Sequence, residues 1–258
     1  MANQLPDIGL DDRYFEQLSR LEENNFWFRS RNDVILWALS HFFSKAQNLL
    51  EVGCGTGFVL SAIERSFPEI ALSGSELYGE DLAFAKERLN RANLVQVDAR
   101  RVPFKGGFDV IGAFDVLEHI EEDQEVLSEI FGAVKPGGGI ILTVPQPRWL
   151  WSFFDEVSCH KRRYSRIELI KKVESAGFHV LWSTFFFTLI LPVMMISRLT
   201  RIKKETDNFR ELDMLAEFRI PPMLDILFEK VCSLENGFRK RAISLPRGGS
   251  LLCVALKR

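Results

Sequence analysis

The chain has 258 residues, 47% of them hydrophobic and 26% charged, so it can bury a core of its own and is neither disordered nor collagen-like. Lysine and arginine number 33 against 35 acidic residues, which gives a net charge of -2 and no basic surplus of the kind that binds nucleic acid. The four cysteines form no CxxC pair, which disfavours a zinc ribbon or a redox motif. The length fits a single domain over 1–258. Because the sequence does not open with a secretory signal, we expect the protein in the cytoplasm.

Apolar periodicity predicts helices and strands that alternate along most of the chain. The expected helices cover 11–24, 32–43, 58–66, 79–91, 126–134 and 165–177. The expected strands cover 48–52, 70–74, 94–97, 108–114, 140–144, 179–187 and 251–256. Apolar strands that alternate with helices predict a doubly wound α/β fold whose parallel sheet is covered on both faces.

An uncharged segment over 180–197 is about long enough to span a membrane, but Pro192 interrupts it. We favour a buried strand that runs into a helix over an interfacial helix or a true span. Two further helices, 193–204 and 222–234, precede the last strand. They predict a cap over the sheet edge. The chain is thus divided into N-terminal helices, a core, a helical cap insertion and the last strand, over 1–45, 46–187, 188–248 and 249–258.

A glycine-rich turn follows the first strand in Leu50-Glu-Val-Gly-Cys-Gly-Thr-Gly57. Such a turn lets a ligand approach the backbone closely at the N-terminus of a helix. Dinucleotide dehydrogenases need glycine at the position of Phe58, so the glycine register argues against NAD. The string instead resembles the first motif of class I S-adenosylmethionine-dependent methyltransferases, and the resemblance extends over 25–187 and the last strand.

The resemblance implies a Rossmann-like sheet of seven strands, the last antiparallel, and an enzyme that uses S-adenosylmethionine. It places Glu76 on the ribose hydroxyls and Asp98 on the adenine amino group, beside Ala99. Arg31 would pair with the cofactor carboxylate; the alternative is a solvated arginine. The implied cofactor-binding residues are Arg31, Glu51, Gly53, Cys54, Gly55, Gly57, Glu76, Leu77, Asp98, Ala99 and Phe114.

The acceptor is harder to predict. The segment after the fourth strand lacks the Asn/Asp-Pro-Pro-Tyr motif of enzymes that methylate base amines. Its Asp115-x-x-Glu118-His119 resembles the E-x-x-E-H segment of ubiquinone-type O-methyltransferases. Three interpretations stay open: His119 is a general base, the three side chains bind a divalent metal ion, or Glu118 and His119 cap the next helix. We do not favour the metal.

A second cluster, Cys159-His-Lys-Arg-Arg-Tyr164, follows the fifth strand. His160 is a rival general base, and Arg162 and Arg163 could hold an acidic acceptor; the alternative is a solvated basic loop.

We therefore expect an enzyme that methylates a small-molecule or lipid-linked acceptor, with oxygen as the favoured atom. The alternatives are transfer to nitrogen or carbon, or a scaffold protein that binds the cofactor without turnover. The apolar segment 193–196 precedes four basic residues, which predicts peripheral contact with the inner face of a membrane; the alternative is packing on the 222–234 helix. These basic residues are Arg198, Arg201, Lys203 and Lys204.

Overall fold

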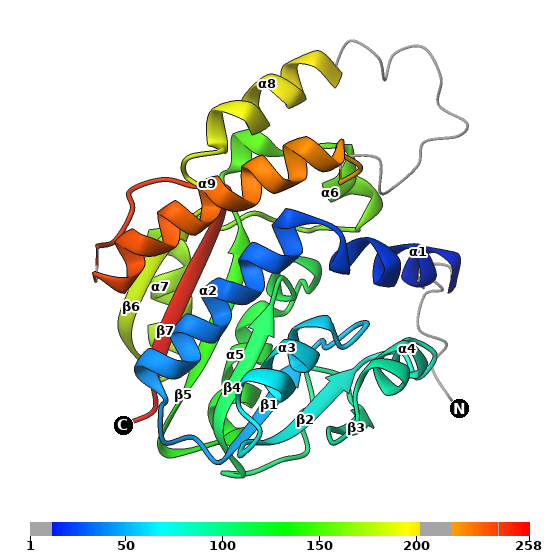
Figure 1. Ribbon diagram of the computed structural model, residues 1–258. Coiled ribbons are helices and arrows are strands. Elements are labelled where there is room, and N and C mark those ends of the chain that lie inside the picture. The colour runs from blue at the N-terminus through cyan, green and yellow to red at the C-terminus, as the bar shows by residue number, and fades with distance from the viewer. Residues whose placement is uncertain (1–11, 202–217, 242) are drawn as a thin grey trace.

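The computed structural model describes residues 12–201, 218–241 and 243–258 (Figure 1). Its α-helices are α1 Asp12–Glu23, α2 Phe26–Phe42, α3 Phe58–Ser66, α4 Asp81–Arg88, α5 Asp123–Ala133, α6 Phe153–Val157, α7 Arg166–Ser175, α8 Leu191–Arg201 and α9 Pro222–Lys240. Its strands are β1 Asn48–Val52, β2 Ala71–Glu76, β3 Asn93–Gln96, β4 Phe108–Phe114, β5 Val134–Pro145, β6 His179–Phe186 and β7 Ser250–Leu256. Two short 3-10 helices complete the set, η1 Leu117–His119 and η2 Arg148–Leu150.

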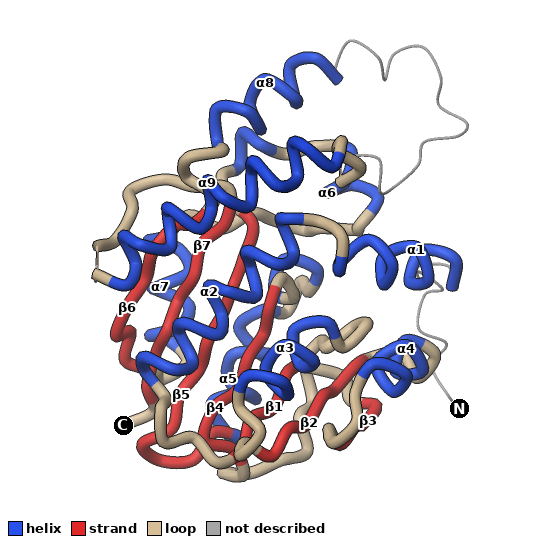
Figure 2. The backbone as a smooth tube through the Cα atoms, in the orientation of Figure 1, coloured by secondary structure: helices blue, strands red, loops and turns tan. Residues whose placement is uncertain are grey.

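The strands form one seven-stranded sheet in the order β3-β2-β1-β4-β5-β7-β6 (Figure 2). The five strands from β3 to β5 pair in parallel, and β7 is antiparallel to both β5 and β6. The chain order reverses between β1 and β4, which is the place where open α/β sheets bind ligands. The predicted doubly wound sheet with an antiparallel last strand is confirmed.

Alternate residues of the strands enter two separate core layers. Leu49 and Val110 belong to the layer that also contains residues of α2 and α3, whereas Leu50 and Ile111 face the layer built with α5 and α7. This follows from the strand geometry, because successive side chains point to opposite faces of a sheet. In Figure 1, α2, α3 and α9 accordingly lie over one face and α5 and α7 over the other.

Three elements, α2, β5 and α9, extend furthest beyond their expected bounds, by six residues each. Helix α2 begins at Phe26, before the expected 32, because the Asn25 side chain caps it by accepting a hydrogen bond from Trp27 N at 2.9 Å. Strand β5 begins at Val134, where it pairs with Phe108, so the Pro-Gly segment lies inside an irregular strand. Helix α9 continues past 234, where the buried pair Glu235–Arg239 links consecutive turns.

Helix α9, part of the expected cap, packs chiefly on α2, and Arg29 joins the two helices by pairing with Asp225 and Glu229. It also reaches the end of the edge strand β6, where Thr188 N donates to Glu235. The uncharged segment is a strand followed by a helix, as predicted, since β6 ends at Phe186 and α8 begins at Leu191. Within the described residues, no helix combines the length and the apolar character needed to cross a membrane.

Candidate functional site

A cavity of about 830 Å³ lies at the carboxyl ends of the parallel strands. Residues that follow β1, β2, β3 and β4 form its floor, and α8 contributes Val193 and Met194. Every residue that the sequence resemblance assigned to the cofactor lines this cavity except Gly57. The strand ends thus bring together side chains that are far apart in the sequence.

The glycine loop adopts left-handed backbone conformations that favour glycine. Gly55 has a φ of 48°, and a Cβ there would meet no atom within 4 Å, so the backbone is open on that side. Gly57 has a φ of 74°, and a Cβ there would lie 3.1 Å from Ala85 Cα. Gly55 therefore leaves room for a ligand, whereas Gly57 serves the close packing of α3 against α4.

The carboxylate of Glu76 is held at the end of β2 by two backbone N–H groups. Gly55 N donates to one oxygen at 3.0 Å, and Leu77 N donates to the other at 2.7 Å. Burial raises the pKa of Glu76, and these two hydrogen bonds act against that rise. Each oxygen keeps a second acceptor position, so the carboxylate can still accept from a ligand.

Asp98 follows β3 and forms a two-bonded ion pair with Arg100. Arg100 Nε lies 3.0 Å from one carboxylate oxygen and Nη2 lies 2.8 Å from the other. The hydrogen bonds from Arg100 hold the pKa of Asp98 below its ordinary value, so the carboxylate stays charged. Ala99 lies beside it on the cavity wall.

Arg31 points into the cavity from α2 and is held by Asp115. Its Nη1 donates to Asp115 Oδ2 at 2.6 Å, and Thr143 donates to the other oxygen of Asp115 at 3.1 Å. Arg31 Nε is buried and has no hydrogen-bond partner among the described residues. Arg29 lies away from the cavity at the α9 interface, so of these two arginines Arg31 is the one that lines the cavity.

Two other assigned residues are deeply buried at the cavity wall. Glu51 is 2% exposed, its Oε2 lacks a hydrogen-bond partner in the described part of the chain, and burial raises its pKa well above the ordinary value. Burial likewise raises the pKa of the Cys54 thiol, so that thiol is neutral. Phe114 ends β4 as an apolar part of the wall.

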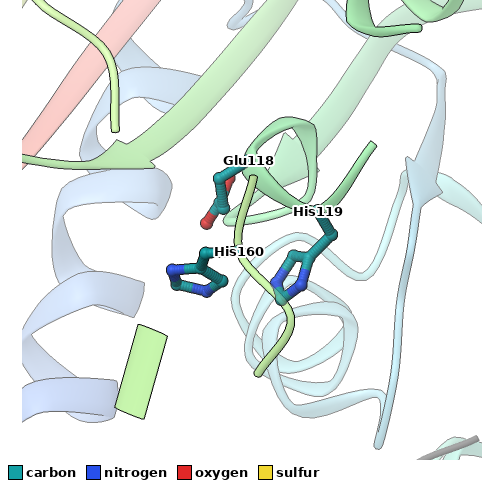
Figure 3. A group of neighbouring side chains, drawn as sticks. All are labelled: Glu118, His119 and His160. Carbon is teal, nitrogen blue, oxygen red and sulfur yellow. The ribbon is translucent and has the colours of Figure 1, made fainter. Parts of the chain in front are cut away.

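Glu118, His119 and His160 form one compact group, hereafter the Glu–His–His cluster. One potential ligand atom from each lies within 4.8 Å of the other two, and Figure 3 shows the three side chains gathered around one point. Asp115 is not a member, because it pairs with Arg31. The helix-cap interpretation is wrong: α5 begins at Asp123, and neither Glu118 nor His119 caps it.

Both imidazoles are oriented through Nδ1. His119 Nδ1 lies 2.7 Å from Ser158 O, and His160 Nδ1 lies 2.8 Å from Asp155 Oδ1. Because a carbonyl or carboxylate can only accept, the hydrogen of each of these bonds sits on Nδ1, and Nε2 takes no part in them. Burial, helped by the nearby His160, lowers the pKa of His119 to about 4 and keeps it neutral at pH 7.

Arg162 and Arg163 do not offer their guanidinium groups to an acidic acceptor. Arg163 forms two hydrogen bonds with the buried Asp155, at 2.7 Å and 2.8 Å. Arg162 Nη1 pairs with Asp123 at 2.8 Å. Both guanidinium groups are therefore committed to carboxylates of the protein itself. The alternative of a basic loop that neutralises Asp155 is confirmed for that pairing, but the loop is not solvated at Arg163, which is 5% exposed.

Glu22 is a site residue that the sequence did not indicate. It reaches the cavity from α1, where Thr56 Oγ1 donates to it at 2.6 Å and Arg88 Nη1 donates at 2.8 Å. This buried group ties α1 to the glycine loop. No motif surrounds Glu22, so only the packing of α1 could reveal it.

Comparisons with known proteins agree with this geometry. Residues 50–142 match the family model described as a methyltransferase domain. A Mycolicibacterium smegmatis protein designated a probable S-adenosylmethionine-dependent methyltransferase is 28% identical over 164 residues, which are 62% of either chain. A ubiquinone biosynthesis O-methyltransferase of Psychrobacter arcticus is 28% identical over 105 residues, 38% of this chain and 40% of that protein. Both alignments cover less than two thirds of the relative.

Solved structures share the fold. A Haloferax volcanii methyltransferase, solved with the Trm112 methyltransferase activator, superposes with a TM-score of 0.62 at 16% identity over 95% of each chain. The phosphoethanolamine N-methyltransferase 2 of Haemonchus contortus, solved with S-adenosyl-L-methionine, gives a TM-score of 0.56 at 20% identity over 87% of this chain and 52% of that one. The glycine loop, the strand order and the match of residues 50–142 to a methyltransferase domain together support a class I S-adenosylmethionine-dependent methyltransferase.

Proposed function

We propose that this protein transfers a methyl group from S-adenosylmethionine to a small-molecule or lipid-linked acceptor, at oxygen. The observation that carries the proposal is the Glu76 carboxylate, anchored by Gly55 and Leu77 beside the open backbone of Gly55. A carboxylate in this place suits the two hydroxyls of a ribose. S-adenosylmethionine would supply the activated methyl group.

The residues of the cavity fit the rest of that cofactor. Asp98 and Ala99 stand where the adenine is expected, and Asp98 keeps acceptor capacity beyond its pair with Arg100. Arg31 lines the cavity and suits the carboxylate at the methionine end, because a guanidinium can bind a carboxylate through two donors. The cavity continues from there to the Glu–His–His cluster.

Methylation of a hydroxyl requires its proton to leave near the site of transfer. His119 and His160 are the expected catalytic residues, and both line the cavity with a free Nε2. We place the acceptor oxygen beside them. The enzyme's part is to hold that oxygen in line with the methyl group and to exclude water. Such positioning alone can accelerate a reaction greatly.

Labelling tests the activity. The purified protein is incubated with methyl-labelled S-adenosylmethionine and with lipid and polar extracts of its host, and we expect label in one extracted fraction. Mass spectrometry and NMR of the labelled product identify the atom that carries the methyl group, and label on nitrogen or carbon would contradict transfer to oxygen. Cofactor binding without label in any fraction would favour the scaffold alternative.

Replacing Arg31 with lysine is expected to weaken S-adenosylhomocysteine binding about tenfold or more, because a hydrogen bond between charged groups contributes about 1.5–3 kcal/mol. Isothermal titration calorimetry measures the change. The matched control is Arg65→Lys on α3, where the side chain is exposed and lies outside the cavity. Equal affinity in Arg31→Lys and the wild type would show that Arg31 pairs with Asp115 but does not bind the cofactor.

A lipid-linked acceptor is supported by the apolar outer surface of α8 and α9. Ile196 is 61% exposed and Met223 is 84% exposed, while Val193 and Met194 of the same α8 line the cavity. The three acidic residues of α9 are occupied within the protein, because they bind Arg29, Arg239 or backbone N–H groups. An otherwise cytoplasmic enzyme could thus rest this surface on the inner face of a membrane. Lys203 and Lys204 lie outside the described residues.

Flotation with anionic vesicles at low salt tests this contact. We expect the wild type to float and the double variant Ile196→Glu/Met223→Glu to stay at the bottom, because charge on the apolar surface opposes its insertion. Reversal of Arg198, Arg201, Lys203 and Lys204 to glutamate should also abolish flotation, since each basic residue near such a surface contributes about 1 kcal/mol. The control is Ile167→Glu on α7, a 69% exposed residue away from this surface. Wild-type protein that fails to float would contradict membrane contact.

A further inference from the structure

We propose that the Glu–His–His cluster is a binding site for a divalent transition-metal ion such as Zn²⁺. It offers one carboxylate and two imidazoles, with ligand atoms from all three inside a 4.8 Å span (Figure 3). Two histidines and one glutamate are a ligand set that holds zinc in catalytic sites and leaves a coordination position open. Magnesium prefers oxygen ligands and should bind weakly.

Glu118 is the strongest single observation. Its side chain belongs to a residue that is 0% exposed, and neither carboxylate oxygen accepts a hydrogen bond from any described residue. A buried carboxylate with both oxygens unpartnered is costly unless a cation or a proton meets it. The nearby cations do not meet it, since Arg31 is bonded to Asp115 and Arg163 to Asp155. A bound metal ion would satisfy this carboxylate.

The two histidines are supported as metal ligands usually are. Each uses Nδ1 for a hydrogen bond to a fixed acceptor, the Ser158 carbonyl for His119 and the Asp155 carboxylate for His160. Such partners fix the tautomer and the ring orientation, and leave the other nitrogen for the metal. Asp155 is itself held by Arg163 and Ser152, so the support is rigid.

The cluster also faces the cavity that would hold the acceptor, because all three residues line it. An acceptor hydroxyl bound at the open coordination position would lose its proton to water more readily, since the cation stabilises the alkoxide. The oxygen would then form the O–C bond while the methyl S–C bond breaks, and the sulfur would take that electron pair and lose its positive charge. This use of the metal rests on the proposed function, whereas metal binding by itself does not.

The test measures metal in the full-length protein without any acceptor. After equilibrium dialysis against Zn²⁺, mass spectrometry should find one equivalent per wild-type chain. Glu118→Gln, which keeps the side-chain shape, and His160→Ala should each lower the affinity at least tenfold. The controls are His41→Ala and His179→Ala, which change exposed histidines outside the cavity and should retain the metal. Substoichiometric wild-type binding, or full binding by Glu118→Gln, would overturn the site.

A second measurement needs no variant. Co²⁺ added to the wild type should give visible absorption bands of a low-symmetry N/O site, and Zn²⁺ should displace them. A spectrum identical to that of aqueous Co²⁺ would overturn the proposal. Calorimetry with S-adenosylhomocysteine, with and without chelator, keeps the two proposals separate: cofactor binding that persists while metal binding fails rejects the metal site and leaves the methyltransferase function standing.

Discussion

Replacing Glu76 with alanine is expected to weaken S-adenosylhomocysteine binding about 100-fold or more. The carboxylate would accept from both ribose hydroxyls, and a hydrogen bond to a charged acceptor contributes about 1.5–3 kcal/mol. The same change also removes the acceptor that holds Gly55 N and Leu77 N, so the glycine loop loses an anchor. Isothermal titration calorimetry on the purified variant measures the effect.

Two variants separate these contributions. Glu80→Ala removes an exposed carboxylate shortly after Glu76 and should leave the affinity unchanged. Glu76→Gln keeps one oxygen that can accept from the backbone but loses the charge. Its affinity for S-adenosylhomocysteine should therefore lie between those of Glu76→Ala and Glu80→Ala. Undiminished binding by Glu76→Ala would show that the ribose is held elsewhere, and with it the proposed placement of the cofactor would fail.

Replacing Asp155 with alanine is expected to lower the free energy of unfolding by about 3–5 kcal/mol, because the change leaves a buried arginine without its counter-charge. Asp155 is 0% exposed and accepts hydrogen bonds from Arg163, His160 and Ser152. Urea unfolding followed by circular dichroism measures the loss. The loop that carries His160 depends on these bonds, so the midpoint should fall sharply.

The neighbouring residue provides the control. Glu156→Ala removes an exposed carboxylate from the same short helix and should change the unfolding free energy by less than about 0.5 kcal/mol, the usual range for surface substitutions. If Asp155→Ala and Glu156→Ala unfold at the same urea concentration, Asp155 does not hold the loop. His160 would then need another source of its orientation.

Much of the fold could be predicted because its signals are local. The apolar runs at β1 and β4 have the length and flanks of buried strands, and the capping box of Ser165 and Glu168 marks the start of α7. The errors at α2, β5 and α9 concern ends of elements. At these ends a single contact, and not the apolar periodicity, sets where the element begins or ends. The start of β5, for example, is set by the pairing of Val134 with Phe108.

The cofactor half of the cavity was also open to prediction. Parallel strands end at one edge of a sheet, so Glu76 and Asp98, each at or just after a strand end, must lie near the glycine loop. The placement needs only the strand order, and that order came with the motif. What the motif could not supply was the role of Gly57, which depends on how closely α4 packs against α3.

The alternation of strands and helices, the glycine turn and the carboxylates at strand ends could be predicted, since each depends on neighbours along the chain. Which charged groups meet could not be predicted, because it depends on the packing of distant segments. The tertiary structure paired Arg31 with Asp115 across 84 positions, committed Arg162 and Arg163 to carboxylates, and brought His160 rather than Asp115 beside Glu118 and His119. These encounters depend on how α2, α6 and the loop after β5 fold over the sheet. Many weak packing contacts along the whole chain set that arrangement, and no local pattern encodes it.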